Sequence, residues 1–416
     1  MKIVELSKEQ YNSFAYRHPL ISFYQVQEWG DLKAKTGWRQ VLLGYVDEEE
    51  NVLAAGNFLL KKMPGVKRYL AYCPRGYLID YKNQELLKNF NDALKAKLKS
   101  LNCFELIIDP NFPCRQRDVN GDVVEGGYDN REVVNELISM GYRHNGYNLY
   151  YENLQPRWLF RLNITRPYEE LEKDFKNEAK RRSRKKDFLA INTRELARDE
   201  VHVFQRLSEM TAVRRGFDDR SLKYYMDMYD ALHDAGVVRY MVSEIDVAKC
   251  RENVDKEVAT LEERIAKSKN PGRIKEDNVT LTTYKKILEQ LDKCEKESGS
   301  IVPLSATCIM SVGNEMVMLF AGNDEDYLQH FNSSNIMVTD LIKLAQEEGY
   351  EYFNFYGITG DFSKDNPQYG LYLYKRQYGG EVLELIGEFE YIFSPLVKKG
   401  YDFALNLYEK LRKLRK

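Results

Sequence analysis

The residues best suited to chemistry lie in the C-terminal third of the chain, on two aromatic-rich stretches. These are residues 352–357 (YFNFYG) and residues 372–376 (YLYKR). A cation flanked by aromatic side chains sits in a low-dielectric setting, where it stabilises developing negative charge strongly. Lys375 is therefore a candidate for such a role, with Asn354 and Tyr356 on the strand before it. The alternative is an ordinary Tyr-rich strand whose lysine and arginine face solvent.

Asp109 is a second candidate, because it directly follows the apolar run 104–108 and precedes Pro110. A proline cannot donate to a sheet ladder, so the strand is expected to end here. A carboxylate at such a strand end commonly faces a cleft. A turn or cap aspartate explains the position equally well.

Basic side chains are concentrated at two places. Lys33 and Lys35 lie between Trp29 and Trp38, and we expect their apolar stems to lie along an aromatic surface. Residues 180–186 (KRRSRKK) form a dense block of cations: Lys180, Arg181, Arg182, Arg184, Lys185 and Lys186. Such a block concentrates charge for binding phosphates, which we favour over a solvated helix face.

Composition excludes several classes of protein. The chain has 416 residues, 43% of them hydrophobic, which excludes a wholly disordered chain. The 62 basic and 64 acidic residues nearly cancel, which excludes a globally basic nucleic-acid-binding protein. There is no nucleophile elbow, Walker loop or G-x-G-x-x-G motif, and none of the six cysteines forms a C-x-x-C pair. No apolar run approaches the ~20 residues that span a bilayer, and the N-terminus has no signal-peptide core. We therefore expect a cytoplasmic protein with reduced cysteines.

Helix and strand patterns alternate along the chain, which predicts a mixed α/β fold. Helices are predicted at 84–101, 133–140, 167–186, 201–214, 221–234 and 338–348. Strands are predicted at 41–46, 52–60, 104–108, 237–245 and 352–355, and from residues 158, 303 and 316 onwards. Residues 113–130, rich in Gly and Asp, are predicted to form a loop.

Residues 246–298 are heavily charged and poor in aromatic residues. Their apolar residues recur at spacings of three, four and seven, which is typical of a coiled-coil seam. Asn270-Pro271-Gly272 interrupts the pattern midway. Because proline breaks a helix and glycine permits a reversal, we predict an antiparallel helical hairpin inserted between two strands. The charged outer faces offer no apolar stripe for docking, so we expect the hairpin to be dispensable for folding of the body.

The C-terminal stretch from Phe403 has Leu407, Leu411 and Leu414 at helical spacing, with basic residues around them. We favour a helix packed on the first domain. A weak contact with an anionic membrane is the alternative.

Three short motifs follow one another along the chain. Residues 75–81 read RGYLIDY, residues 108–110 read IDP, and residues 353–362 read FNFYGITGDF. They resemble the R-G-P-v-i-D-y, I-D-P and Y-N-F-Y-G-v-s-G-x-F motifs of the Fem family of tRNA-dependent peptidyltransferases. Tyr77 stands where the family usually has proline. The resemblance covers nearly the whole chain, and the predicted hairpin lies where FemA-like members carry one.

The resemblance implies a fold and an activity. Fem proteins are built from two domains similar to GNAT acetyltransferases. Here the first would be residues 1–155, completed by 386–416, and the second residues 156–385, with the hairpin at 246–299. Family members transfer an amino acid from aminoacyl-tRNA to the stem-peptide side-chain amine of a lipid-linked or nucleotide-linked muramyl-pentapeptide, and need neither metal nor cofactor. A homodimer or heterodimer with a related transferase, peripheral membrane contact and the identity of the amino acid are left open.

The resemblance also implies roles for individual residues. The family's catalytic lysine falls on Lys375, and its strand-end carboxylate falls on Asp109. Substrate contacts are expected at Lys33, Lys35, Arg220, Tyr224, Phe320, Asn354, Tyr356 and Tyr374. Phe320 stands where relatives have tyrosine and lacks the hydroxyl. The basic block 180–186 and the hairpin would meet the tRNA. Lys375 would stabilise the tetrahedral oxyanion, and Asp109 would position the amine, because an unperturbed aspartate has a pKa of about 3.9.

Two other functions remain open. A CoA-dependent N-acyltransferase would share the fold, but the chain lacks a clear Q/R-x-x-G-x-G/A loop for the CoA pyrophosphate. A non-catalytic RNA-binding coiled-coil protein is disfavoured by the near-neutral charge and by the FNFYG motif.

Overall fold

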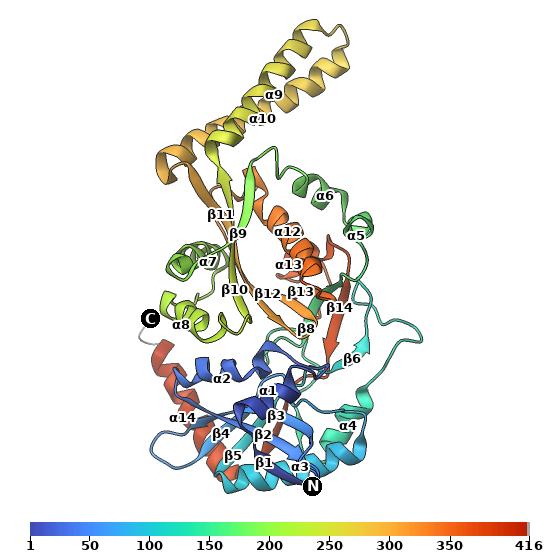
Figure 1. Cartoon of the computed structure of the whole chain (residues 1–416), viewed down its shortest axis with the longest axis vertical. Helices are drawn as coiled ribbons and strands as arrows, with labels where there is room; N and C mark the ends of the chain where they lie inside the picture. Colours follow the sequence, from blue (N-terminus) through green and yellow to red (C-terminus); the bar gives the residue numbers. More distant parts are fainter. Residues whose placement is uncertain (414–416) are drawn as a thin grey trace.

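The computed structural model describes residues 1–413, apart from the side chains of residues 297, 298, 328, 329, 406, 408, 409 and 411–413. Its strands form two sheets, which lie one beyond the other along the molecule (Figure 1). Sheet A has the order β1 (Lys2–Glu5), β2 (Trp38–Val46), β3 (Val52–Lys62), β4 (Tyr69–Cys73), β5 (Cys103–Ile108), β15 (Phe389–Ile392), β7 (Arg143–His144). Sheet B has the order β6 (Pro113–Gln116), β14 (Glu381–Leu385), β8 (Trp158–Asn163), β13 (Tyr352–Ile358), β12 (Glu315–Asn323), β11 (Ile301–Val312), β10 (Val238–Asp246), β9 (Ile191–Glu195). We call the parts built on these sheets the first and the second domain.

Each sheet contains one parallel pair among antiparallel neighbours. The parallel pairs are β4–β5 in sheet A and β12–β13 in sheet B. Parallel strands end at the same edge, so the residues that follow them come together there. Arg75 and Asp109 are such residues, one after each strand of the β4–β5 pair. Polar groups are thereby gathered at this edge of sheet A.

Helices cover both faces of sheet A. On one face, α3 (Gln84–Ser100) and α4 (Arg131–Ser139) bury the core that includes Phe90 and Leu94. On the other face lie α1 (Lys8–Ala15), the short 3₁₀ turn Phe23–Gln25 and α2 (Gln27–Ala34). The helix predicted at residues 84–101 is thus confirmed, and its regularly spaced apolar residues form the face of α3 that packs on the sheet.

The two domains share a continuous apolar core. The core against α1 and α2 runs on into α7 (Val201–Arg215), α8 (Leu222–Leu232) and strands β10–β12. Four helices, α5 (Tyr168–Asp174), α6 (Asn177–Ser183), α12 (Ser333–Glu347) and α13 (Tyr369–Arg376), cover the opposite face of sheet B. Polar side chains at the domain boundary are therefore surrounded by the packed side chains of this shared core.

Two strands come from parts of the chain remote from their sheets. β15 lies between β5 and β7 in sheet A, although it follows sheet B in the chain. β6 pairs with β14 in sheet B, although its residues lie inside 1–155. The domain limits expected from the resemblance do not provide for β6, and they stay a prediction.

Some predicted elements differ from the structure. Residues 167–186 form two helices rather than one, because Phe175 and Lys176 are extended between α5 and α6. The predicted loop 113–130 begins with β6. The Tyr-rich stretch before Lys375 is α13 rather than a strand, because its Tyr372 and Lys375, three residues apart, pack together against sheet B.

The last helix, α14 (Pro395–Lys413), begins against the first domain. The rings of Tyr401 and Phe104 lie 5.2 Å apart, and Lys398 Nζ lies 3.0 Å from Glu105 Oε1. Both contacts precede Phe403, so the favoured prediction that the stretch from Phe403 packs on that domain is not confirmed. Phe403 and Leu407 are exposed, whereas the side chains of Leu411 and Leu414 lie outside the described part of the chain. No helix in the described residues 1–413 has the length and apolarity to cross a membrane.

The inserted hairpin projects from the end of the second domain (Figure 1). It consists of α9 (Val247–Lys267) and the longer α10 (Pro271–Ser298). The Asn270 side chain caps α10 and Pro271 stands in its first turn, a position that proline tolerates. The reversal therefore precedes Gly272, which is helical. The predicted mixed α/β fold class with an inserted helical hairpin is confirmed.

The base of the hairpin is part of the body, contrary to expectation. Its buried residues Val247, Cys250, Val254, Ile287 and Leu291 share one core with Leu189, Ile191, Val302, Leu304 and Phe331. Farther out, Tyr284 still packs on Phe188 at 5.1 Å between ring centroids. The prediction of a dispensable hairpin without a docking stripe is therefore wrong for its base. The same apolar positions that join the two helices also cover the ends of β9–β11.

This packing predicts different outcomes for two truncations. Replacing residues 248–297 with a short Gly/Ser linker is expected to unfold the second domain. Several aliphatic side chains would lose cover worth about 1.5–3 kcal/mol each, against a total stability of about 5–15 kcal/mol. Replacing residues 260–282 should leave the melting temperature within a few degrees of the parent. Calorimetry of both variants tests this, and equal melting temperatures would contradict it.

Candidate functional site

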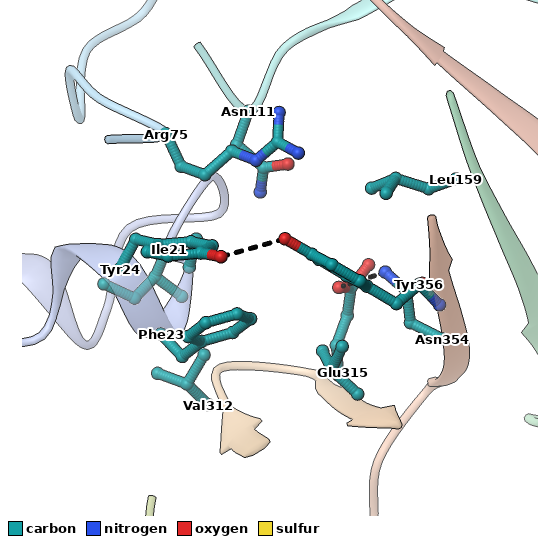
Figure 2. Close-up of a pocket in the computed structure, with 12 residues that line it drawn as sticks. Ile21, Phe23, Tyr24, Arg75, Asn111, Leu159, Val312, Glu315, Asn354 and Tyr356 are labelled. Atoms are coloured by element: carbon teal, nitrogen blue, oxygen red, sulfur yellow. Dashed lines mark hydrogen bonds between the residues drawn. The ribbon is translucent and has the colours of Figure 1, made fainter. Parts of the chain in front are cut away.

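A pocket opens where the two domains meet, and both contribute to its walls (Figure 2). The first domain supplies Ile21, Ser22, Phe23, Tyr24, Arg75 and Asn111. The second domain supplies Leu159, Val312, Glu315, Val317, Asn354 and Tyr356. The hydroxyl oxygens of Tyr24 and Tyr356 lie 2.9 Å apart and join the two walls. The space between these residues is partly open to solvent, and about 20 Å³ of it is wide enough for a water-sized group.

Tyr356 reaches the pocket because β13 bulges at this point. Its φ is +64°, and the register of β13 against β8 shifts between Asn354 and Gly357. A bulge re-aims side chains, and a positive φ at a bulky residue is strained. The Asn354 side chain holds the turn by accepting from the Tyr356 N–H at 2.8 Å. The interdomain connector adds Gln155, whose Oε1 lies 2.6 Å from the Tyr24 hydroxyl and 3.0 Å from that of Tyr356.

Asp109 lies behind the Arg75 wall and is almost fully buried. Its Oδ1 accepts from the Arg75 backbone N–H at 2.6 Å, and its Oδ2 accepts from the Tyr72 hydroxyl at 2.8 Å. Burial raises the pKa of Asp109 to about 6, although the nearby Arg75 opposes the rise. The carboxylate therefore titrates closer to neutrality than an unperturbed aspartate. Both of its oxygens are engaged in holding Arg75 and Tyr72 in place.

Lys375 is buried, with 7% of the residue exposed, so the alternative of a solvent-facing lysine is wrong. Its ammonium donates to the carbonyl oxygens of Gly357 at 2.6 Å and Tyr356 at 3.2 Å. Burial lowers the pKa of Lys375 to about 7. No carboxylate among the described residues pairs with it. Lys375 approaches the bulge from the helix-covered face of sheet B, whereas the Tyr356 side chain points into the pocket.

A pair of cations stands beside the pocket. Lys33 Nζ lies 4.9 Å from the centre of the Trp29 ring, as expected for a stem that follows an aromatic surface. Burial, and then the charge of Arg220, lowers the pKa of Lys33 to about 8. The Arg220 guanidinium lies 5.5 Å from the Tyr224 ring. Within residues 1–413, no acidic partner is found for Lys33 or Arg220, and such a pair attracts anions.

The pair is connected to the pocket through aromatic contacts. The Trp29 ring packs edge-on against Tyr24, with 4.7 Å between their centroids. Tyr224 is half-buried in the same interdomain core as Tyr24 and Tyr356. An anion held by Lys33 and Arg220 would therefore lie at the rim of the pocket.

Three predicted substrate residues lie elsewhere. Lys35 forms an ion pair across the domain boundary with Asp227, at 3.2 Å. Phe320 packs in the interdomain core, 6.0 Å from the Tyr225 ring. The Tyr374 hydroxyl donates to the Ser334 carbonyl at 3.2 Å, on the side of α12. None of them lines the pocket, and their roles as substrate contacts stay predictions.

Much of the basic block 180–186 is neutralised by acids distant in sequence or one helical turn away. Arg182 pairs with Glu178, Arg184 with Glu172 at 2.7 Å, and Lys186 with Asp340 at 2.9 Å. Lys180 donates to the Lys173 carbonyl, and the pKa of Lys185 is lowered by burial and by Arg181. The net charge available for phosphates is smaller than the sequence suggests. Contact between this block and RNA stays a prediction.

Four residues of the site were not predicted from the sequence. Arg75 lies in the RGYLIDY motif but had no assigned role, and Tyr24, Gln155 and Glu315 lie in no motif. They join the site because four separate segments meet at the domain boundary. Contacts between segments that are distant in the chain produce no repeating residue pattern, so a single sequence does not reveal them.

Comparisons with known proteins agree with this architecture. The family model described as "FemAB family" matches residues 6–405. "Lipid II:glycine glycyltransferase" of Staphylococcus epidermidis is 28% identical over 415 residues, covering 95% of this chain and 93% of that protein. The protein of the same name from Staphylococcus aureus is 26% identical over 414 residues, with the same coverage. The fold resembles the crystal structure of FemX with a TM-score of 0.77 and 24% identity, over 96% of this chain and 99% of that one. A match of the family model over nearly all of the sequence shows that the chain belongs to the FemAB family.

Proposed function

We propose that the protein transfers an aminoacyl group from aminoacyl-tRNA to the side-chain amine of a peptidoglycan stem peptide. The acceptor is a muramyl-peptide carrying a diphosphate. The names of the Staphylococcus relatives make glycine and lipid II the first donor residue and acceptor to test.

The observation that carries this proposal is the unpaired cation couple at the rim of an interdomain pocket. Lys33 is half-buried and Arg220 is exposed, and neither has an acidic partner among the described residues, so the pair suits a diphosphate better than a neutral group. The pocket beside them is lined by Tyr24, Tyr356 and Glu315, and suits the peptide part of the same molecule. Lys375 lies just beyond the bulge that carries Tyr356.

The chemistry is attack of a neutral amine on an ester carbonyl. The tetrahedral intermediate carries a negative oxygen, which the Lys375 ammonium would stabilise. The ester breaks towards the ribose hydroxyl of the tRNA, which takes up the proton that the amine loses. Asp109 would act as a positioning residue, because its oxygens hold Arg75 and Tyr72 at the edge of the pocket.

A mass-detected transfer assay tests the proposal. The protein is incubated with a panel of charged tRNAs and either lipid II or the nucleotide-linked muramyl-pentapeptide, and the added mass on the acceptor is identified. We expect the mass of one aminoacyl residue on the stem-peptide amine. Acetyl-CoA and other acyl-CoA donors serve as controls, since transfer from CoA alone would favour the N-acyltransferase instead. Absence of transfer from every charged tRNA would contradict the proposal.

A further inference from the structure

The second-domain wall of the pocket carries a carboxylate that the proposed function has not yet used. Glu315 stands at the start of β12, and its Oε2 accepts from the Asn354 amide at 3.1 Å. Figure 2 shows Glu315 and Asn354 together on one side, with Arg75 and Asn111 on the other. The Glu315 side chain is 21% exposed, so it stays accessible to a ligand.

Glu315 shares its arginine with a second carboxylate. Its Oε1 lies 3.5 Å from the Arg161 guanidinium, which makes a closer contact of 2.8 Å with Glu381. The other guanidinium at the pocket, Arg75, is balanced by Asp109. These two arginines therefore face three carboxylates. The surplus negative charge meets the pocket at Glu315, the sole acidic residue among the described residues that line it.

We propose that Glu315 binds the protonated primary amine of the acceptor side chain and so selects acceptors with a basic side chain. The identity of the ligand as a stem peptide rests on the proposed function. An aliphatic amine has an ordinary pKa of about 10.4 and arrives as an ammonium. The carboxylate offers it a charged hydrogen bond, and the rings of Phe23, Tyr24 and Tyr356 offer contact to its methylene chain. The step is binding alone, before the amine loses its proton.

The ammonium is assigned to the acceptor rather than to the donor's α-amine because of what lies next to the pocket. The aromatic contact from Tyr24 to Trp29 leads directly to Lys33, where the acceptor's diphosphate is placed. This neighbourhood favours one molecule whose diphosphate contacts Lys33 and whose amine contacts Glu315. Kinetics with each substrate varied in turn separates the two sources of the ammonium.

Binding without a donor tests Glu315 directly. The ligands are a diphosphate-bearing muramyl-peptide with a free lysine amine and the same compound with that amine acetylated, titrated by calorimetry. The parent protein should prefer the free amine by about tenfold or more, the size expected of a charged hydrogen bond. Glu315→Gln should lose the preference, and Glu315→Asp should keep part of it. Glu381→Gln is the matched control, because it removes the other carboxylate on Arg161 outside the pocket lining, and its preference should persist.

The outcomes separate this inference from the proposed function. An unchanged preference in Glu315→Gln, or an equal loss in Glu381→Gln, would overturn the inference while the transferase stands. If Glu315→Gln raises the KM for the aminoacyl-tRNA donor instead of the KM for the acceptor, the inference is also overturned. If the parent binds neither muramyl ligand, the proposed acceptor is wrong. The pocket is then titrated by NMR with Nα-acetyl-lysine methylamide and its Nε-acetylated form: a preference for the free amine that Glu315→Gln abolishes supports the site, and equal shifts refute it.

Discussion

Replacing Lys375 with methionine should lower turnover by about 100-fold or more, the usual size for one charge-stabilising donor, and should at the same time raise the melting temperature. The two effects share one cause. The ammonium is buried without a carboxylate partner among the described residues, and its bonds go to the carbonyls of Tyr356 and Gly357. Methionine fills a similar volume without a charge to desolvate.

The lowered pKa of Lys375 also predicts how stability and turnover change with pH. Because burial lowers the pKa of Lys375 from 10.5 to about 7, the folded protein carries an unfavourable charge at and below about pH 7. That penalty is relieved as pH rises towards 10.5, so the stabilisation by Lys375→Met should be largest near neutrality and should fade at alkaline pH. If the ammonium stabilises the oxyanion, parent turnover should decline as pH rises through about 7.

Single-turnover rates and calorimetry at a series of pH values measure both effects. Lys364→Met is the control, because Lys364 is exposed on the loop before α13 and should change neither quantity. Near-parent turnover in Lys375→Met would remove this lysine from the mechanism. A lower melting temperature in the variant would show that the buried amine stabilises the fold instead.

Loss of the cation couple should weaken acceptor binding more than it slows chemistry. Arg220→Met and Lys33→Met should each raise KM for the muramyl substrate by about 10- to 100-fold, the range for a hydrogen bond to a charged group, with a much smaller effect on kcat. The reason is that both cations lie at the rim of the pocket, away from Lys375. Arg220→Met should also raise the pKa of Lys33, because part of the depression comes from Arg220.

Steady-state kinetics with the acceptor varied tests this pair. Lys8→Met is the control, since Lys8 is an exposed lysine that pairs with Asp31 and has no role in the site. Its KM should remain close to that of the parent. A collapse of kcat with unchanged KM in Arg220→Met would place Arg220 in the chemistry and remove it from acceptor binding.

The periodic elements could be predicted from the sequence because their signals are local. The inward stripe of α3 repeats every three to four residues, and the hairpin seam is interrupted at Pro271. In both cases hydrogen bonds between near neighbours in the chain set the structure, so spacing alone is informative. The motif around Asp109 likewise placed a carboxylate at a strand end, whereas the bulge at Tyr356 was not predicted.

Burial and long-range proximity depended on the tertiary structure. Whether Lys375 faced solvent or the core depended on how α13 packs against sheet B, and the answer changed its pKa. The block 180–186 looked strongly cationic, yet its charge is reduced by partners such as Asp340, more than 150 residues away. Tyr24, Gln155 and Glu315 meet only because the two domains share one core. The sequence by itself determined the elements and the chemistry available, whereas desolvation and charge pairing act through space and were decided by how those elements pack.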